Sequence, residues 1–217
     1  MKTDAQLKHE VEQELEWDPA VNASHVGVAV DKGVVTLSGH LETYGEKYLV
    51  ERAVQRVQGV KALAVELDVK LAPGHKRNDS ELAQAAEAAL TWHTLVPDER
   101  LTVKVEGGWV TLRGDVDWEY QRNAAAQAIR SLTGVLGFTN EIVIKPRVMS
   151  SNVTTRIREA LARHAEREAD RIEVQVSGAT ATLKGTVHSW AERAAAQGAA
   201  WSAPGVTSVI NELKVGA

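Results

Sequence analysis

The stretch from Val28 to Gly39, VAVDKGVVTLSG, decides the fold because it occurs three times in the chain. The second copy is VKVEGGWVTLRG, from Val103 to Gly114, and the third is VQVSGATATLKG, from Val174 to Gly185. In each copy, alternating apolar residues lie on both sides of a short turn, a pattern typical of a β-hairpin with one buried face. This hairpin is therefore the fixed point of a repeated unit.

The similarity continues around the hairpins at constant offsets, 75 residues from the first copy to the second and 71 from the second to the third. Before each hairpin, apolar residues recur at four-residue steps and predict one face of a helix. These residues are Leu7, Val11 and Leu15; Leu82, Ala86 and Leu90; and Val153, Ile157 and Leu161. Asp4, Asp79 and Ser150 precede these faces and are expected to be N-caps, because their side chains can accept hydrogen bonds from free backbone amides.

After each hairpin, the pattern predicts a second helix with its own apolar face. That face consists of Val50, Ala53, Val54 and Val57; Ala125, Ala128, Ile129 and Leu132; and Ala196, Ala199, Ala200 and Ala203. Gly59, Gly134 and Gly205 are expected to end this helix, and a third strand follows over residues 60–69, 135–144 and 206–215. The order αββαβ predicts an α+β fold. Two helices would pack on a three-stranded mixed sheet, since the helical crossover makes the second and third strands parallel.

The 217 residues therefore predict three tandem domains. We expect the domains to span residues 1–72, 79–145 and 150–217, joined by linkers at 73–78 and 146–149 that are short and contain proline. Seven glycines are expected to have structural roles in turns, bends and helix ends: Gly33, Gly39, Gly108, Gly114, Gly134, Gly185 and Gly205.

The composition excludes several classes of protein. The chain is 44% hydrophobic and 25% charged with a net charge of -4, which is typical of a folded globular protein. The absence of cysteine excludes disulfides and thiolate sites, and no basic excess indicates nucleic-acid binding. No apolar run approaches the ~20 residues of a spanning helix. The charged first residues do not resemble a leader, so we expect a cytoplasmic protein, or a periplasmic one if a leader has been removed.

The sequence shows no catalytic motif. None of the seven histidines forms a closely spaced pair such as HExxH. Gly107 and Gly108 lie between two strands rather than between a strand and a helix, so they indicate a turn and not a phosphate loop. We therefore expect no enzymatic activity and no cofactor, while the sequence leaves the identity of any metal ligand unknown.

Each unit resembles a BON domain. The resemblance rests on the pattern VxVxxGxVxLxG, on a basic residue early in the second helix, and on a closing GVxxVxN. The basic residues are Lys47, Arg122 and Arg193, and the closing asparagines are Asn140 and Asn211. The first unit departs from the pattern with Val65 in place of asparagine, and the third departs from it with Ala179 in place of glycine.

The resemblance implies a non-catalytic, osmotic- or envelope-stress-associated binding protein whose partners are phospholipid or other envelope components. Two alternatives stay open: a cytoplasmic protein that responds to potassium ions, and a protein-interaction or chaperone-like scaffold. The family provides no shared catalytic or ligand motif.

Aromatic and basic residues near the start of the second helix are the lipid-binding candidates. They are Tyr44, Lys47, Trp118, Arg122, Trp190 and Arg193. Tryptophan and tyrosine suit a membrane interface because each is apolar with one polar tip, and the cations would face headgroups. The alternative is that these aromatics pack on a linker or on the next domain. Trp17 and Trp92, which follow the first helix, are expected to cover the core or an interdomain surface.

Overall fold

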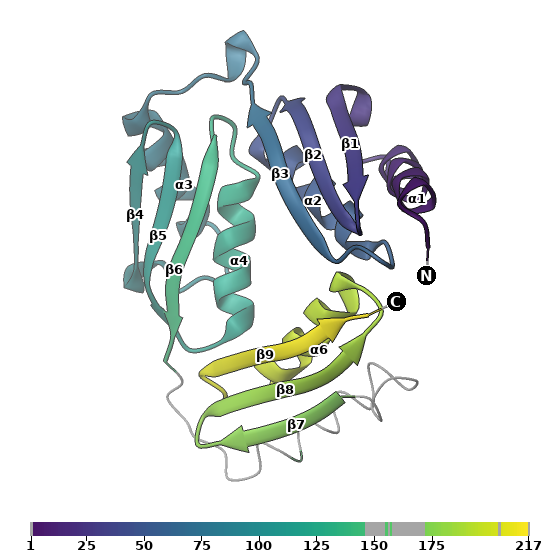
Figure 1. The fold of residues 1–217 in the computed structure, drawn as a ribbon. Coiled ribbons are helices and arrows are strands. Elements are labelled where there is room, and N and C mark those ends of the chain that lie inside the picture. The colour runs from purple at the N-terminus through teal and green to yellow at the C-terminus, as the bar shows by residue number, and fades with distance from the viewer. Residues whose placement is uncertain (1, 146–154, 156, 158–171, 204, 217) are drawn as a thin grey trace.

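The computed structural model describes residues 2–145, 155, 157, 172–203 and 205–216. Within them, three copies of the repeated unit follow one another along the chain (Figure 1). Unit 1 lies at the upper right of that view, unit 2 at the left and unit 3 at the bottom, and in each unit helix lies against one face of the sheet.

Units 1 and 2 have the same order of elements. In unit 1 these are α1 (Asp4–Trp17), β1 (Val26–Asp31), β2 (Val34–Leu41), α2 (Tyr44–Arg56) and β3 (Ala62–Val69). In unit 2 they are α3 (Asp79–Thr91), β4 (Leu101–Glu106), β5 (Trp109–Val116), α4 (Glu119–Arg130) and β6 (Gly137–Ile144). The described part of unit 3 contains β7 (Ile172–Ser177), β8 (Thr180–Val187), α6 (Trp190–Trp201) and β9 (Ser208–Val215).

The three sheets confirm the predicted α+β fold. Each has its strands in chain order, the first pair antiparallel and the second pair parallel. The hairpins also share one register, in which Val28 pairs with Leu37, Val103 with Leu112 and Val174 with Leu183. The repeated sequence therefore specifies one hairpin geometry, built three times.

The glycine at the end of the first two quoted stretches lies where a side chain has no room. Gly39 and Gly114 have φ angles of +126° and +132°. A Cβ atom at Gly39 would lie 2.0 Å from the carbonyl oxygen of His25, and one at Gly114 would lie 2.1 Å from that of Arg100. Both the dihedral angle and the close approach of the neighbouring backbone therefore require glycine.

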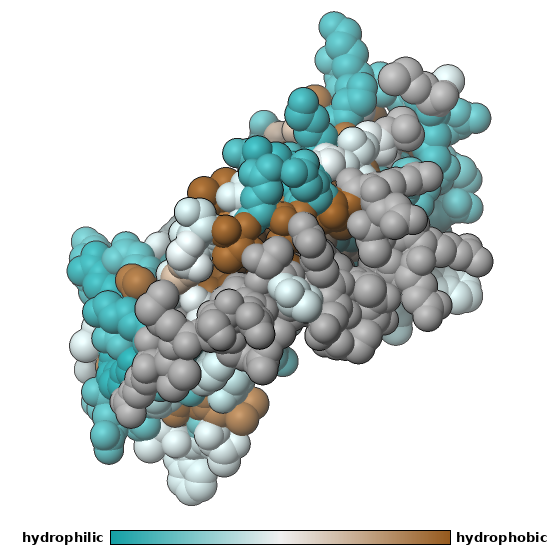
Figure 2. All heavy atoms as spheres, turned by 90° about the horizontal axis from the view of Figure 1, so that it is seen from below, coloured by the Kyte–Doolittle hydropathy of each residue, from teal (hydrophilic) through white to brown (hydrophobic). Residues whose placement is uncertain are grey.

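The predicted apolar helix faces form the core. On the first helices, Leu7, Val11, Leu15, Leu82, Ala86, Leu90 and Ile157 are all buried, while Val153 and Leu161 lie outside the described residues. One buried cluster fills unit 1, and a second continues through units 2 and 3. Seen from below, apolar residues gather near the middle of the molecule, and hydrophilic residues predominate toward its two ends (Figure 2).

The N-cap prediction was one residue late. Thr3 and Asn78 are the N-caps of α1 and α3, and each accepts a hydrogen bond from the third residue of its helix. Asp4 is the first helical residue, and its carboxylate instead accepts hydrogen bonds from the turn amides of Lys32 and Gly33, at 2.7 and 3.0 Å. Asp79 makes the same pair of bonds to the turn of unit 2, at 2.8 and 2.9 Å. These aspartates therefore join helix to hairpin, while Ser150 lies outside the described residues.

The second helices end earlier than predicted. They end at Arg56, Arg130 and Trp201, several residues before Gly59, Gly134 and Gly205. Those glycines have φ angles of +97°, +103° and +94° and lie in the turn that leads into the third strand. The third strands consequently begin at Ala62, Gly137 and Ser208, two residues later than predicted.

Candidate functional site

The six lipid-binding candidates lie at the start of the second helices. Tyr44 and Trp190 are the first residues of α2 and α6, and Trp118 is the N-cap residue of α4. All six side chains are half-buried. α2 packs against both α4 and α6, so this end of each unit faces another unit.

Two of the basic residues bind the sheet of their own unit. Lys47 Nζ donates a hydrogen bond to the carbonyl oxygen of Leu67 at 2.8 Å. Arg193 donates to the equivalent carbonyl of Leu213 at 3.1 Å and to that of Asn211 at 2.7 Å. These cations therefore connect the second helix to the third strand.

Arg122 differs, because it connects unit 2 to unit 3. Its guanidinium donates to Glu119 of the same helix at 2.8 Å and lies 5.0 Å from the centre of the Trp201 ring in unit 3. A cation over an indole face is attracted by the negative π surface. The contact therefore contributes to the packing of unit 3 on unit 2.

The aromatics at the first position of α2 and α6 pack across the units. The Trp190 ring packs against the core of unit 1, and its Nε1 donates a hydrogen bond to the carbonyl oxygen of Val60 at 2.9 Å. Tyr44 of unit 1 packs against the cluster of units 2 and 3. Arg130 of unit 2 lies 4.1 Å from the centre of the Tyr48 ring in unit 1. Together with the Arg122–Trp201 contact, these interactions link all three units, and we call them the interdomain junction.

The structure brings most of the six candidates to this junction or to a sheet of their own unit. Trp118 has the fewest defined contacts of the six. Its backbone amide donates a hydrogen bond to the side chain of Gln121 at 3.0 Å, and its ring is half-buried. Lipid binding by these six residues stays a prediction. A bilayer would reach them only where their half-buried side chains remain accessible.

The two most exposed aromatics among the described residues lie elsewhere, at the ends of the first helices, whereas Trp109 and Tyr120 are about half exposed. Trp17 and Trp92 occupy equivalent positions and are each 86% exposed. The expectation that they cover the core or an interdomain surface is therefore wrong. The last buried residue of each helix is Leu15 or Leu90, two positions earlier. Residues two apart on a helix point to different sides, so the tryptophans face away from the core.

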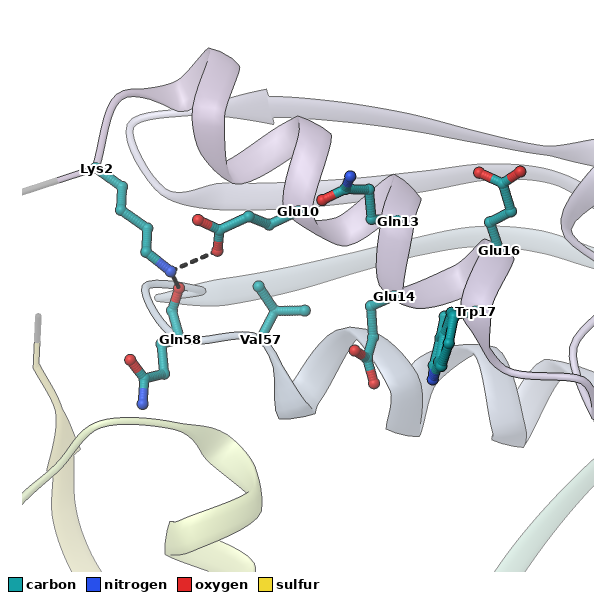
Figure 3. Close-up of a pocket in the computed structure, with 8 residues that line it drawn as sticks. All are labelled: Lys2, Glu10, Gln13, Glu14, Glu16, Trp17, Val57 and Gln58. Atoms are coloured by element: carbon teal, nitrogen blue, oxygen red, sulfur yellow. Dashed lines mark hydrogen bonds and ion pairs between the residues drawn. The ribbon is translucent and has the colours of Figure 1, made fainter.

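The surroundings of Trp17 are acidic. Figure 3 shows it at the end of α1 beside Glu14 and Glu16, with Glu10 further back on the same helix. These residues line an open cavity of about 780 Å³ between α1 and the end of α2. Asp18 follows directly, and the hydrogen bond from Arg56 holds the pKa of its carboxyl below the usual range. Glu10 is paired with Lys2, and Glu14 and Asp18 are paired with Arg56, so the four carboxylates exceed these cations by two and leave the surface around this tryptophan net acidic.

The segment that contains Trp92 has few charged side chains. The run AALTWHTLVP, residues 88–97, contains no Asp, Glu, Lys or Arg, and within it Leu95 is 51% exposed. The nearby carboxylate of Asp98 accepts a hydrogen bond from Thr91 at 2.7 Å. The backbone amide of Leu95 donates to Nδ1 of His93 at 3.4 Å, which holds the turn after α3. The contrast between this run and the acidic residues at the equivalent positions before Trp17 is visible in the sequence, and it distinguishes the two tryptophans.

The comparison with known families accounts for the whole of this architecture. The chain matches the BON domain over residues 3–70, 78–146 and 150–217. The chain belongs to the BON domain family. Units 1, 2 and 3 are accordingly BON domains 1, 2 and 3.

Individual relatives are more distant. The chain is 26% identical over 129 residues to osmotically-inducible protein Y of Escherichia coli (strain K12), which covers 58% of this chain and 64% of that protein. Among solved structures, it is similar to the C-terminal domain of CdsD, the structural protein of the type III secretion system of Chlamydia trachomatis. That match has 17% identity, full coverage of both chains and a TM-score of 0.27. A second CdsD structure has 18% identity, covers 94% of this chain and 90% of its own, and has a TM-score of 0.26. TM-scores this low support no further inference.

The described residues contain neither a metal-binding cluster nor a membrane-spanning helix. No group of three or more histidine and carboxylate side chains in that part of the chain is placed to hold a metal ion. Nor does any helix there combine the length and apolar content that crossing a bilayer requires. The expected compartment stays a prediction.

Burial at the interdomain junction makes one carboxylate sensitive to pH. Burial raises the pKa of Glu51 on α2, and the attraction of Lys47 and Arg130 only partly opposes it. The folded protein therefore retains this proton to a higher pH than the unfolded chain, whose glutamate pKa is about 4.3. The contribution of Glu51 to stability is then lost as the pH rises through the raised pKa.

Replacing Glu51 with Gln is expected to raise the melting temperature at pH 7, because the variant buries no charge there. At about pH 4 and below, where the wild-type carboxyl is protonated, the two melting temperatures should converge. Thermal denaturation from pH 4 to 7 measures both. Glu87→Gln, on the exposed face of α3, is the control and should follow the wild type across the range. A melting temperature of Glu51→Gln below that of the wild type at pH 7 would contradict this prediction.

Proposed function

We propose that this protein is a non-catalytic, osmotic-stress-associated binding protein that contacts phospholipid surfaces through Trp92 and Leu95 of BON domain 2. Membership of the BON family and the similarity to osmotically-inducible protein Y support the first part of the proposal. The exposure of a tryptophan and a leucine in an uncharged run supports the second.

The exposure of Trp92 carries the proposal. An indole ring suits the interface of a bilayer, because its apolar body enters the headgroup region while its N–H remains hydrated. Leu95, three residues later, adds apolar area to the same turn. Removing charged groups from water is expensive, so an uncharged surface enters an interface at lower free-energy cost than the acidic surface at Trp17.

The expected binding is weak. A single myristoyl chain, with about 0.8 kcal/mol for each buried methylene, gives only marginal membrane binding. One tryptophan and one leucine bury less apolar surface than such a chain, so binding should be measurable only at millimolar lipid. With no cationic cluster in residues 88–97, it should also depend little on salt.

Trp92→Ala is expected to reduce co-sedimentation with phosphatidylcholine–phosphatidylglycerol vesicles at least about tenfold, since most of the inserting apolar surface is lost. Trp17→Ala is the matched control: an equivalent position, equal exposure and acidic neighbours. It should bind like the wild type. Equal binding by wild type and Trp92→Ala would refute the assignment of this site.

The same experiment addresses the other proposals for this chain. Loss of binding in Trp118→Ala but not in Trp92→Ala would favour the second-helix residues as the lipid site. Running each measurement in potassium chloride and again in sodium chloride tests a potassium response. A scaffold for other proteins would leave all variants without vesicle binding, and would instead predict suppression of client aggregation.

A further inference from the structure

A second cavity lies between BON domains 1 and 3. It has a volume of about 460 Å³, within the roughly 300–1,000 Å³ typical of small-molecule sites. Domain 1 contributes Lys2, Lys32 and Lys61, among others, and domain 3 contributes His188 and Gly216. Three lysines around one cavity are unexpected in a domain whose sequence is acidic overall.

Two of these lysines have no ion pair among the described residues. Lys2 Nζ forms an ion pair with Glu10 and donates to the carbonyl oxygen of Gln58 at 3.2 Å, as Figure 3 shows. Asp4 also lines the cavity. Its two oxygens accept the turn amides, and its negative charge offsets one of the three ammonium groups. The structure gives the ammonium groups of Lys32 and Lys61 no ion pair within the described ranges 2–145, 172–203 and 205–216.

Lys32 is held in a conformation that lysine disfavours. Its φ of +51° is the one positive value among the non-glycine residues that the structure describes. The equivalent residues in domains 2 and 3 are Gly107 and Gly178, with φ of +57° and +60°. The left-handed conformation costs a residue with a Cβ about 1–2 kcal/mol. Glycine would satisfy the turn without that cost, so the backbone conformation does not require a lysine here.

Lys61 also replaces an uncharged residue of the other domains. Its amide donates to the carbonyl oxygen of Gly33 at 2.9 Å, and its side-chain carbons lie 3.0–3.3 Å from where a Cβ on Gly33 would be. In domain 2, Leu136 makes the same amide bond to Gly108 and lies 3.0 Å from the corresponding position. A leucine therefore fits this place, and packing alone does not require an ammonium group.

We propose that this cavity binds the phosphate group of a small, water-soluble phosphorylated molecule. Two ammonium groups without an ion pair, with Lys2 nearby, outnumber the one carboxylate of Asp4, and each can donate charge-assisted hydrogen bonds to phosphate oxygens. The volume leaves room for an organic group beside the phosphate. This site is independent of Trp92.

Inorganic pyrophosphate and glycerol 3-phosphate are the probes, titrated calorimetrically into the full chain at constant ionic strength. Saturable binding is expected for the wild type. The double variant Lys32→Gly/Lys61→Leu, which copies the residues of domain 2, should bind at least about tenfold more weakly, because two charged donors are removed. Its melting temperature should equal or exceed that of the wild type, so that lost binding does not reflect unfolding.

Lys8→Gln/Lys104→Gln removes the same net charge from exposed positions outside the cavity and should bind like the wild type. The proposal is overturned if the wild type shows no saturable binding, or if both double variants bind equally. Binding to dihexanoyl phosphatidic acid with none to the two soluble probes would overturn the soluble ligand in favour of a lipid headgroup. None of these outcomes depends on vesicle binding through Trp92.

Discussion

Replacing Gly114 with Ala is expected to lower the free energy of unfolding by about 3–5 kcal/mol, the sum of backbone strain and overpacking. The new Cβ would lie 2.1 Å from the carbonyl oxygen of Arg100, at a φ of +132°. The atoms nearest to the new Cβ belong to the backbone of Arg100 and Leu101 and not to a flexible side chain. The hairpin of BON domain 2 therefore has to open. Differential scanning calorimetry would measure the loss.

Gly198→Ala provides the control with the opposite sign. Gly198 is exposed on α6, and a Cβ there would meet no atom within 4 Å. Alanine is favoured over glycine inside a helix by about 0.8–1 kcal/mol, so this variant should be slightly more stable than the wild type. Equal destabilisation of the two variants would mean that the close approach at Gly114 is not what requires glycine.

The second large effect is expected for Trp190→Ala at the interdomain junction. A buried Trp→Ala change costs about 3–5 kcal/mol, and the half-buried Trp190 should lose roughly 2–4 kcal/mol. The variant loses its packing on the core of BON domain 1 and the hydrogen bond to Val60, and it leaves Arg193 without the ring that lies 5.3 Å away. We also expect domains 1 and 3 to separate, which small-angle X-ray scattering would detect as a larger radius of gyration.

Trp17→Ala is the matched control for this variant. It removes the same side chain from a site that is 86% exposed, and it should change neither the stability nor the radius of gyration. An unchanged radius of gyration in Trp190→Ala would show that the junction does not depend on this contact.

The repeated hairpin explains why so much of the fold was predictable. Leu37, Leu112 and Leu183 are buried by packing within their own unit. The alternation of apolar and polar residues in the sequence predicts that burial directly. The helix faces follow in the same way. A three-fold repeat also tests each assignment twice more, because a pattern without structural meaning would not recur at a constant offset.

Contacts between domains produce no repeating pattern in the sequence, so they could not be predicted in the same way. Tyr44 and Trp190 share one position of the repeat, yet each packs on a different cluster. The sequence shows an amphipathic residue at the start of a helix, and whether its partner is a bilayer or another domain depends on how the domains assemble. Trp92 was misplaced because a large apolar residue near a core helix favours burial, whereas its angular position places it outside.

The N-cap error has a local physical cause. Asp4 and Asp79 are suitable caps by residue type, but a carboxylate that bonds two adjacent turn amides gains more than one that bonds a single helix amide. The preceding residue then takes the cap position. A capping rule considers only residues near the start of the helix, and the hairpin turn is nearly thirty residues away in the sequence. Such a rule therefore cannot predict this bond.

The central claim is that Trp92, rather than the aromatics at the second helices, meets the membrane. Tryptophan emission on addition of millimolar phosphatidylcholine–phosphatidylglycerol vesicles tests it most directly, in the wild type and in Trp92→Phe, Trp118→Phe and Trp190→Phe. We predict a blue shift in the wild type that Trp118→Phe and Trp190→Phe retain and that Trp92→Phe loses, because the reporting indole is then absent. A shift that persists in Trp92→Phe and disappears in Trp118→Phe or Trp190→Phe would contradict the account.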